Sequence, residues 1–156
     1  MTPPLNAIRA LTGGDNHAVQ ILTSAHDGTR SGAIALSVQL SALDPLLVSV
    51  ALRRGHPIEP LIRDSRSFAI CRVSADEKLL VRKFGEHAPP DEPDDPFDSL
   101  PTLTLETGSP VVKRAVAALD CEVVRHLDLE ADHELFVGLV RAAYPEPIDH
   151  QPEAGT

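Results

Sequence analysis

Residues 32–67, GAIALSVQLSALDPLLVSVALRRGHPIEPLIRDSRS, are the stretch that decides the fold. Two apolar, strand-like runs flank the turn dipeptide Asp44-Pro45, and the second run is apolar enough to be buried on both faces. An Arg-Arg-Gly-His loop at 53–56 follows, and then a short helical pattern. The order strand, turn, buried strand, basic loop and short helix predicts a small antiparallel β-barrel with a site for an anionic ligand at its rim.

Strand-like and helical segments continue on both sides of this stretch. Asp27-Gly28 is a hairpin turn signal between two strand-like runs, and Ser74 with Glu77 forms a capping box that predicts the start of a helix. The expected fold is therefore mainly β with short helices. The predicted strands cover 18–25, 31–40, 46–52, 68–73, 115–127 and 135–143, and the predicted helices cover 58–64 and 75–84.

Length and composition predict a single domain. The chain has 156 residues, 42% of them hydrophobic, and no apolar run approaches the ~18 residues of a membrane span. Two cysteines without a CxxC motif or a signal-peptide pattern are typical of reduced core residues in a cytoplasmic protein. We expect an N-terminal arm over 1–17, a domain over 18–144 and a flexible tail over 145–156.

One segment interrupts the pattern. Residues 86–101, EHAPPDEPDDPFDSLP, are rich in Pro and Asp and cannot form a central strand. We interpret them as a solvated surface insertion; long loops in compact domains also serve as lids or partner contacts, and the sequence leaves that alternative open.

The charge is unevenly distributed along the chain. The formal net charge is -9, which argues against nucleic acid as a partner because phosphate backbones require a basic face. Residues 53–83 nevertheless carry eight Lys and Arg against four Asp and Glu. A local basic region on an acidic protein suits a small phosphorylated ligand, although solvated faces of two helices would produce the same pattern.

Three pieces of the sequence together resemble a known family. They are DPLLVSVALRRG at 44–55, LIRDSRSFAICRV at 61–73 and SPVVKRAVAALDCEVVRHLDLEADHELFVGLV at 109–140. In order and spacing they resemble the flavin reductase-like family of FMN-binding split barrels. The resemblance implies a Greek-key split β-barrel and a homodimer with flavin near the subunit interface. It further implies FMN or FAD as cofactor, NAD(P)H as hydride donor and an oxygenase as a partner for the reduced flavin.

The chain departs from this family where side chains approach the flavin. Ile34 and Leu36 replace two hydroxyl residues of the family pattern, which leaves Ser37, and His56 stands where many members offer a hydroxyl to the phosphate. We expect backbone N–H groups of this strand to face the flavin ring and cations to replace the lost hydroxyls on the phosphate. The predicted cofactor-binding residues are Ala33, Ile34, Ala35, Leu36, Ser37, Arg53, Arg54, His56, Arg82 and Lys83.

His133 is the predicted catalytic residue. The resemblance places this histidine near the reactive face of the flavin or the nicotinamide, whereas a histidine in an Asp-His turn is otherwise often a structural turn residue. No histidine or cysteine spacing indicates a metal site. The predicted function is an FMN-dependent NAD(P)H oxidoreductase, and the alternative is a non-catalytic split-barrel module that has lost or changed its phosphorylated ligand.

Overall fold

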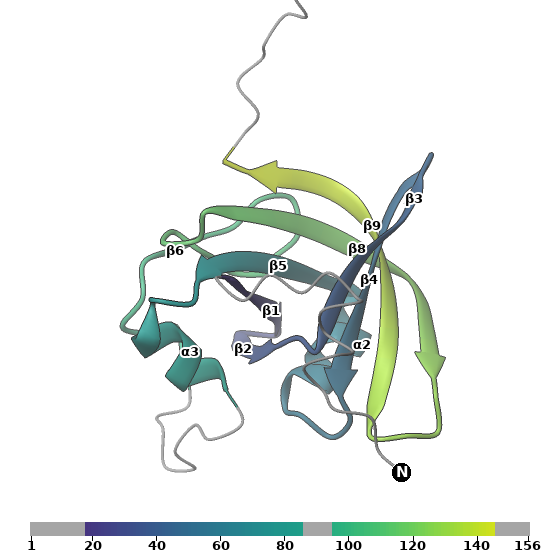
Figure 1. The fold of residues 1–156 in the computed structure, drawn as a ribbon, viewed down its shortest axis with the longest axis horizontal. Helices are drawn as coiled ribbons and strands as arrows, with labels where there is room; N and C mark the ends of the chain where they lie inside the picture. The colour runs from purple at the N-terminus through teal and green to yellow at the C-terminus, as the bar shows by residue number, and fades with distance from the viewer. Residues whose placement is uncertain (1–17, 86–94, 146–156) are drawn as a thin grey trace, which may run out of the picture.

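The computed structural model describes residues 18–85 and 95–145, and these form a curved, mainly antiparallel β structure (Figure 1). Seven strands form one sheet in the order β2-β1-β5-β8-β9-β4-β3, and every neighbouring pair is antiparallel. The predicted split barrel is thereby confirmed. The strands are β1 (Ala18–His26), β2 (Thr29–Ile34), β3 (Ser37–Leu43), β4 (Leu46–Arg53), β5 (Ser67–Ser74), β8 (Ala117–Asp128) and β9 (His133–Tyr144).

A two-residue seam joins the two edges of the sheet. The sequence predicts one strand over 31–40, but the structure divides it into β2 at one edge and β3 at the other. Between them, Ala35 donates its N–H to the carbonyl of Gln20 in β1, and Leu36 donates to the carbonyl of Ala51 in β4, both at 3.0 Å. The strand is interrupted because consecutive residues must bond to opposite sides of the barrel.

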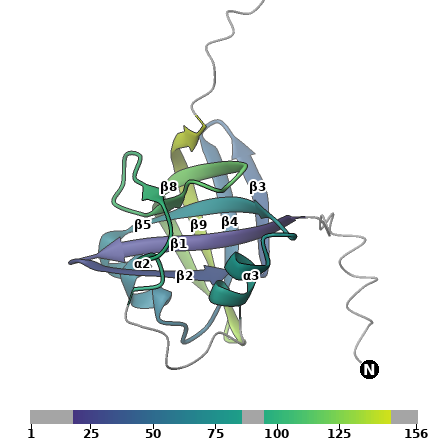
Figure 2. The ribbon, with the colours of Figure 1, turned by 90° about the vertical axis from the view of Figure 1, so that its left-hand side faces the viewer.

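Two groups of strands cross one another steeply. In Figure 2, β1, β2 and β5 run across the front, while β4 and β9 pass behind them at a large angle. The twelve-residue strands β8 and β9 connect the groups, and their pairing shifts register between Asp120 and Cys121 and again between Val123 and Arg125. Such irregularities bend a strand and increase its twist, which lets one strand pair serve both groups.

The interior consists of two apolar clusters, one on each side of β5. One cluster contains Phe68 and Phe136, and the other contains Phe84 and Phe97. Gly138 makes the first cluster feasible, because a Cβ at this position would lie 2.6 Å from the Phe68 ring and 2.7 Å from the Cβ of Cys121. The ring of Phe68 therefore packs directly over the backbone of β9.

Two short helices flank the sheet, and the second begins later than the sequence predicts. Helix α2 (Ile58–Ser65) matches the prediction and buries Ile58 and Ile62. Helix α3 (Lys78–Phe84) begins at Lys78 rather than Ala75, and Glu77 makes no side-chain cap. Ser74 instead accepts the N–H of Asp76 on its Oγ and that of Glu77 on its carbonyl, so the expected capping box forms a separate turn.

Helix α3 packs against the core through only part of its surface. Leu80 and Phe84 are buried, whereas Leu79 is exposed. With seven residues, α3 has only about two turns.

The final part of the predicted surface insertion belongs to the core, which corrects its interpretation as solvated. Phe97 is buried with its ring centroid 5.2 Å from that of Phe84, and Leu100 is buried as well. Arg30 holds the segment around Phe97 in place by donating two hydrogen bonds to Asp95, at 2.7 and 2.9 Å. Its guanidinium also lies 5.3 Å from the centroid of the Phe97 ring. Residues 86–94 lie outside the described residues.

A small hairpin that the sequence pattern does not indicate packs at one side of the molecule. Its strands are β6 (Thr102–Leu103) and β7 (Val111–Val112), too short to show a periodicity. Buried Asp120 accepts both the N–H and the hydroxyl of Thr107 at 2.6 Å, which fixes the loop between these strands.

Candidate functional site

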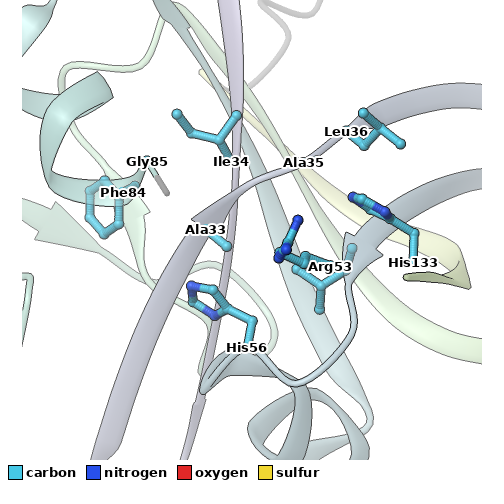
Figure 3. A pocket seen from close by; sticks show the side chains of 10 residues that line it. Ala33, Ile34, Ala35, Leu36, Arg53, His56, Phe84, Gly85 and His133 are labelled. Carbon is cyan, nitrogen blue, oxygen red and sulfur yellow. The ribbon is translucent and has the colours of Figure 1, made fainter. Parts of the chain in front are cut away.

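An open cleft of about 270 Å³ lies where the seam, the end of β4, the start of β9 and the end of α3 meet (Figure 3). One side of the cleft is apolar, and the other carries a guanidinium and two imidazoles. In Figure 3 the Arg53 side chain lies between those of His56 and His133. The lining residues are Ala33, Ile34, Ala35, Leu36, Leu52, Arg53, His56, Phe84, Gly85 and His133.

The apolar wall is formed by the seam, and its backbone donors are partly committed. The sequence predicts that backbone N–H groups between residues 33 and 37 face a ligand. The N–H groups of Ala35 and Leu36 are already donated to the carbonyls of Gln20 and Ala51. That expectation is therefore wrong for these two groups, because closing the barrel uses them. The wall offers a ligand mainly apolar surface, from Ile34 and Leu36.

The polar end of the cleft follows from how the chain leaves β4. His56 stands just before α2, and its Nδ1 accepts the N–H of Ile58 at 3.1 Å. This hydrogen bond leaves the proton of the neutral ring on Nε2, which becomes a donor available to a ligand. Burial lowers the pKa of His56 and favours that neutral form. Arg53, the last residue of β4, adds a permanent positive charge on the same side.

His133 stands opposite Arg53 in the strand pairing, as the first residue of β9. Its Nδ1 lies 3.1 Å from Oδ1 of Asp132, and its side chain is only 19% exposed. The hydrogen bond to His133 lowers the pKa of Asp132, so the carboxylate stays ionised and holds the ring with Nε2 free for the cleft. A carboxylate that orients an imidazole is an arrangement suited to placing a proton or a substrate.

Four of the predicted cofactor-binding residues do not line the cleft. Arg54 turns away and donates to the carboxylate of Asp128 and to the carbonyl of Ala131 at 3.0 Å. Lys83 lies 3.3 Å from the hydroxyl of Ser99, and both Ser37 and Arg82 are exposed outside the cleft. The cleft brings together the remaining predicted residues: Ala33, Ile34, Ala35, Leu36, Arg53, His56 and His133.

Three lining residues were not predicted, namely Leu52, Phe84 and Gly85. Gly85 ends α3, and a Cβ there would lie 2.8 Å from the carbonyl of Val81, so this position requires glycine. An apolar residue followed by glycine at the end of a predicted helix is the one sequence signal that pointed here. Nothing in the sequence indicated that the end of this helix reaches the seam.

The two cysteine thiols lie outside the cleft. Cys71 and Cys121 are free and buried, and burial raises their thiol pKa values to about 11 and about 12. Within 18–85 and 95–145, no group of three or more His, Cys, Asp or Glu side chains is arranged to hold a metal ion. Over the same ranges, no helix has the length and apolarity that crossing a membrane requires.

The fold is an antiparallel barrel whose seam carries a cleft with one apolar and one polar side. Comparison with known proteins identifies the family. The family model of the flavin reductase-like domain matches residues 14–153, nearly the whole chain. The chain belongs to this family, and it is an oxidoreductase of the flavin reductase type, as its sequence predicted.

Individual relatives agree with this assignment. The chain is 27% identical over 150 residues to the FMN reductase (NADH) RutF of Enterobacter cloacae, covering 94% of this chain and 90% of that one. It is 30% identical over 139 residues to an NADPH-flavin oxidoreductase of Streptomyces viridifaciens, covering 87% and 70%. Among solved structures, the Streptomyces globisporus NADH:FAD oxidoreductase SgcE6 superposes with a TM-score of 0.73 at 26% identity, covering 92% and 85%.

Proposed function

We propose that the protein binds FMN in the cleft and uses NADH or NADPH to reduce it. The observation that carries this proposal is the polarity of the cleft, with Arg53 and His56 at one end and an apolar wall at the other. An aromatic ring system with a terminal phosphate has the same division. The phosphate would be held by charge-assisted hydrogen bonds from Arg53 and by Nε2–H of His56.

The residues that line the cleft fit a flavin, and the redox chemistry would come from the flavin itself. Bound flavin would accept a hydride from the reduced nicotinamide, which is chemistry that belongs to the cofactor. Ile34, Leu36 and Phe84 would cover the ring and exclude water from one face. His133, oriented by Asp132, would position the nicotinamide or hold a proton at its Nε2 beside the reacting face.

Titration with three ligands tests the cofactor proposal. FMN, FAD and riboflavin share the ring system, and only riboflavin lacks a phosphate. Isothermal titration should give micromolar or tighter binding of FMN and much weaker binding of riboflavin. If none of the three binds, the chain is a non-catalytic split-barrel module, and the flavin assignment fails. Stopped-flow reduction of the loaded protein with NADH and with NADPH then decides the electron donor.

We further infer that two copies of the chain complete the site. Edge strand β3 and its flanks expose leucines, and one of them, Leu36, also lines the cleft. A second copy seated there would cover this apolar stripe and extend the apolar wall of the cleft. The stripe consists of Leu36, Leu40, Leu43 and Leu46, with exposed fractions of 54%, 57%, 77% and 40%.

The dimer is tested with two matched variants. Leu43→Glu places a charge in the stripe, whereas Leu79→Glu places one on α3 at a leucine that is also well exposed, at 61%. Light scattering should report a dimer for wild type and Leu79→Glu, and a monomer with weaker flavin affinity for Leu43→Glu. A monomeric wild type at micromolar concentration would contradict the inference.

The proposal also includes the acceptor of electrons from the reduced flavin and the cellular compartment of the protein. Reduced flavin would pass to an oxygenase partner or to a bound acceptor, and oxygen consumption in the presence of candidate oxygenases tests this step. Two free, buried thiols support a reducing, cytoplasmic setting.

A further inference from the structure

Beneath the basic loop lies a buried acid that the proposed reaction does not use. Glu134 follows His133 in β9, and because side chains alternate along a strand it points away from the cleft side of His133. Its side chain is only 2% exposed. One carboxylate oxygen, Oε1, lies 2.6 Å from Nε2 of His126, and the His126 ring stacks on Phe136 at 4.4 Å between centroids.

The other oxygen of Glu134, Oε2, is buried without a conventional partner. The group within hydrogen-bonding reach is a second carboxyl, that of Glu59 in the first turn of α2. Two carboxylates cannot hydrogen-bond to each other unless one of them carries a proton. A buried unpaired oxygen facing a second acid therefore marks the place of a shared proton.

The surroundings of the two acids indicate which one holds the proton. Burial opposes ionisation of Glu59, but the N–H of Gly55, the Glu134 carboxyl and Arg63 together hold its pKa below the usual value. The Gly55 N–H donates to Glu59 at 3.0 Å, and Arg63 lies 3.1 Å from it. Burial, followed by the hydrogen bond to Glu59, raises the pKa of Glu134, whereas the hydrogen bond to His126 lowers it. Because the net shifts of the two acids have opposite directions, we assign the shared proton to Glu134 and the negative charge to Glu59.

Glu59 connects this pair to the ligand end of the cleft. Gly55 lies between the two residues that we assign to the phosphate, Arg53 and His56, and its φ of +84° is a conformation that favours glycine. The Glu59 carboxylate holds the N–H of Gly55 and so fixes the path of the loop. A change in the charge of the two acids therefore alters the position of the loop through the hydrogen bond between the N–H of Gly55 and the Glu59 carboxylate.

We propose that Glu134 is a positioning residue for flavin binding: the proton that it shares with Glu59 holds the loop at 53–56 in its ligand-receiving shape. The inference rests on the proposed function. Loss of the proton at higher pH places two negative charges side by side. Their repulsion moves the Glu59 carboxylate away from the N–H of Gly55, and the loop then binds flavin more weakly. The other charged or titratable groups facing the pair are Arg63 on α2, His126 on β8 and Arg54 in the loop, and Arg54 in turn bonds to Asp128 on β8.

The test compares the pH dependence of FMN affinity in three proteins. Glu134→Gln keeps a neutral donor toward Glu59 at every pH. Asp64→Asn is the matched control, since it removes an exposed carboxylate from the same helix without touching the pair. Between pH 6 and 9 we expect the Kd of wild type and Asp64→Asn to rise roughly tenfold more than that of Glu134→Gln. Taking each variant relative to wild type cancels the titration of the FMN phosphate itself.

Infrared spectroscopy of the same proteins without flavin provides a second readout. Wild type and Asp64→Asn at pH 7 should show the C=O stretch of a protonated carboxylic acid, and Glu134→Gln should lack it. Absence of this band from wild type, or parallel affinity profiles in all three proteins, would overturn the proposal. A wild type that shows the band but binds no flavin would instead refute the proposed function and remove the coupling with it.

Discussion

The two ends of the cleft are built in opposite ways. At the seam, the N–H groups of Ala35 and Leu36 are used in closing the barrel and the side chains are apolar, so a ligand meets a surface with few free donors. At the loop from Arg53 to His56, the polar groups are side chains. The N–H of Ile58 fixes the His56 ring, and Glu59 fixes the loop backbone by accepting the N–H of Gly55. We expect specific affinity to come mainly from the loop, while the seam provides shape and excludes water.

The largest effect should come from removing His133, which lies beside Arg53 on the polar side of the cleft but outside the loop (Figure 3). His133→Ala should lower the rate of flavin reduction about a hundredfold or more, because general acid–base help or substrate positioning is lost. Flavin affinity should change little. Stopped-flow reduction of the loaded variant by NADH and NADPH measures the rate. Unchanged reduction with a lower melting temperature would assign His133 a structural role.

The comparison between the two ends is tested most directly at Arg53. Arg53→Ala should weaken FMN binding about 10- to 100-fold, since hydrogen bonds to charged groups are the strong ones, and should leave riboflavin binding nearly unchanged. Arg54→Ala is the matched control: the neighbouring arginine bonds to Asp128 and Ala131 instead. If Arg54→Ala costs as much affinity as Arg53→Ala, the division of the cleft described above is wrong.

The hydrogen bond behind the loop predicts a pH-dependent stability. The folded-state pKa of His56 is lowered by burial, so the unfolded chain takes up a proton below about pH 6.5 that the folded chain resists. Flavin-free wild type should therefore lose stability as the pH falls through this window, by at most about 1.4 kcal/mol per pH unit. His56→Asn keeps an acceptor for Ile58 N–H and should lose less. Denaturant unfolding at pH 7.5 and 5.5 measures the difference.

The smallest effect should come from the seam. Ile34→Thr returns a hydroxyl to the wall, and because a neutral hydrogen bond adds only about 0.5–1.5 kcal/mol, FMN should bind only a few-fold tighter. Riboflavin should gain by the same factor, because the added contact is to the ring. A gain confined to FMN would mean that this wall touches the phosphate. Titration calorimetry with both ligands separates the two outcomes.

The sequence predicted the parts of this molecule that depend on local pattern. Strand periodicity located β4, β5, β8 and β9 to within a few residues. Successive side chains of a strand point to opposite faces, which also explains why the neighbouring residues Arg53 and Arg54 point in different directions. What it could not predict depends on contacts between distant segments. The burial of Phe97 requires Phe84 and Arg30, and the division of 31–40 into two strands requires β1 and β4 on opposite sides. Neither requirement leaves a trace in the local composition.

The seam also has a meaning for engineering. Because Ala35 and Leu36 close the barrel through their main chain, closure is indifferent to which side chains stand there. Ligand preference and fold stability are thereby assigned to different atoms of the same residues. A designer who varies position 36 can retune what the cleft accepts while the barrel continues to close in the same way, whereas Ile34 also packs against the core cluster of Phe84 and Phe97.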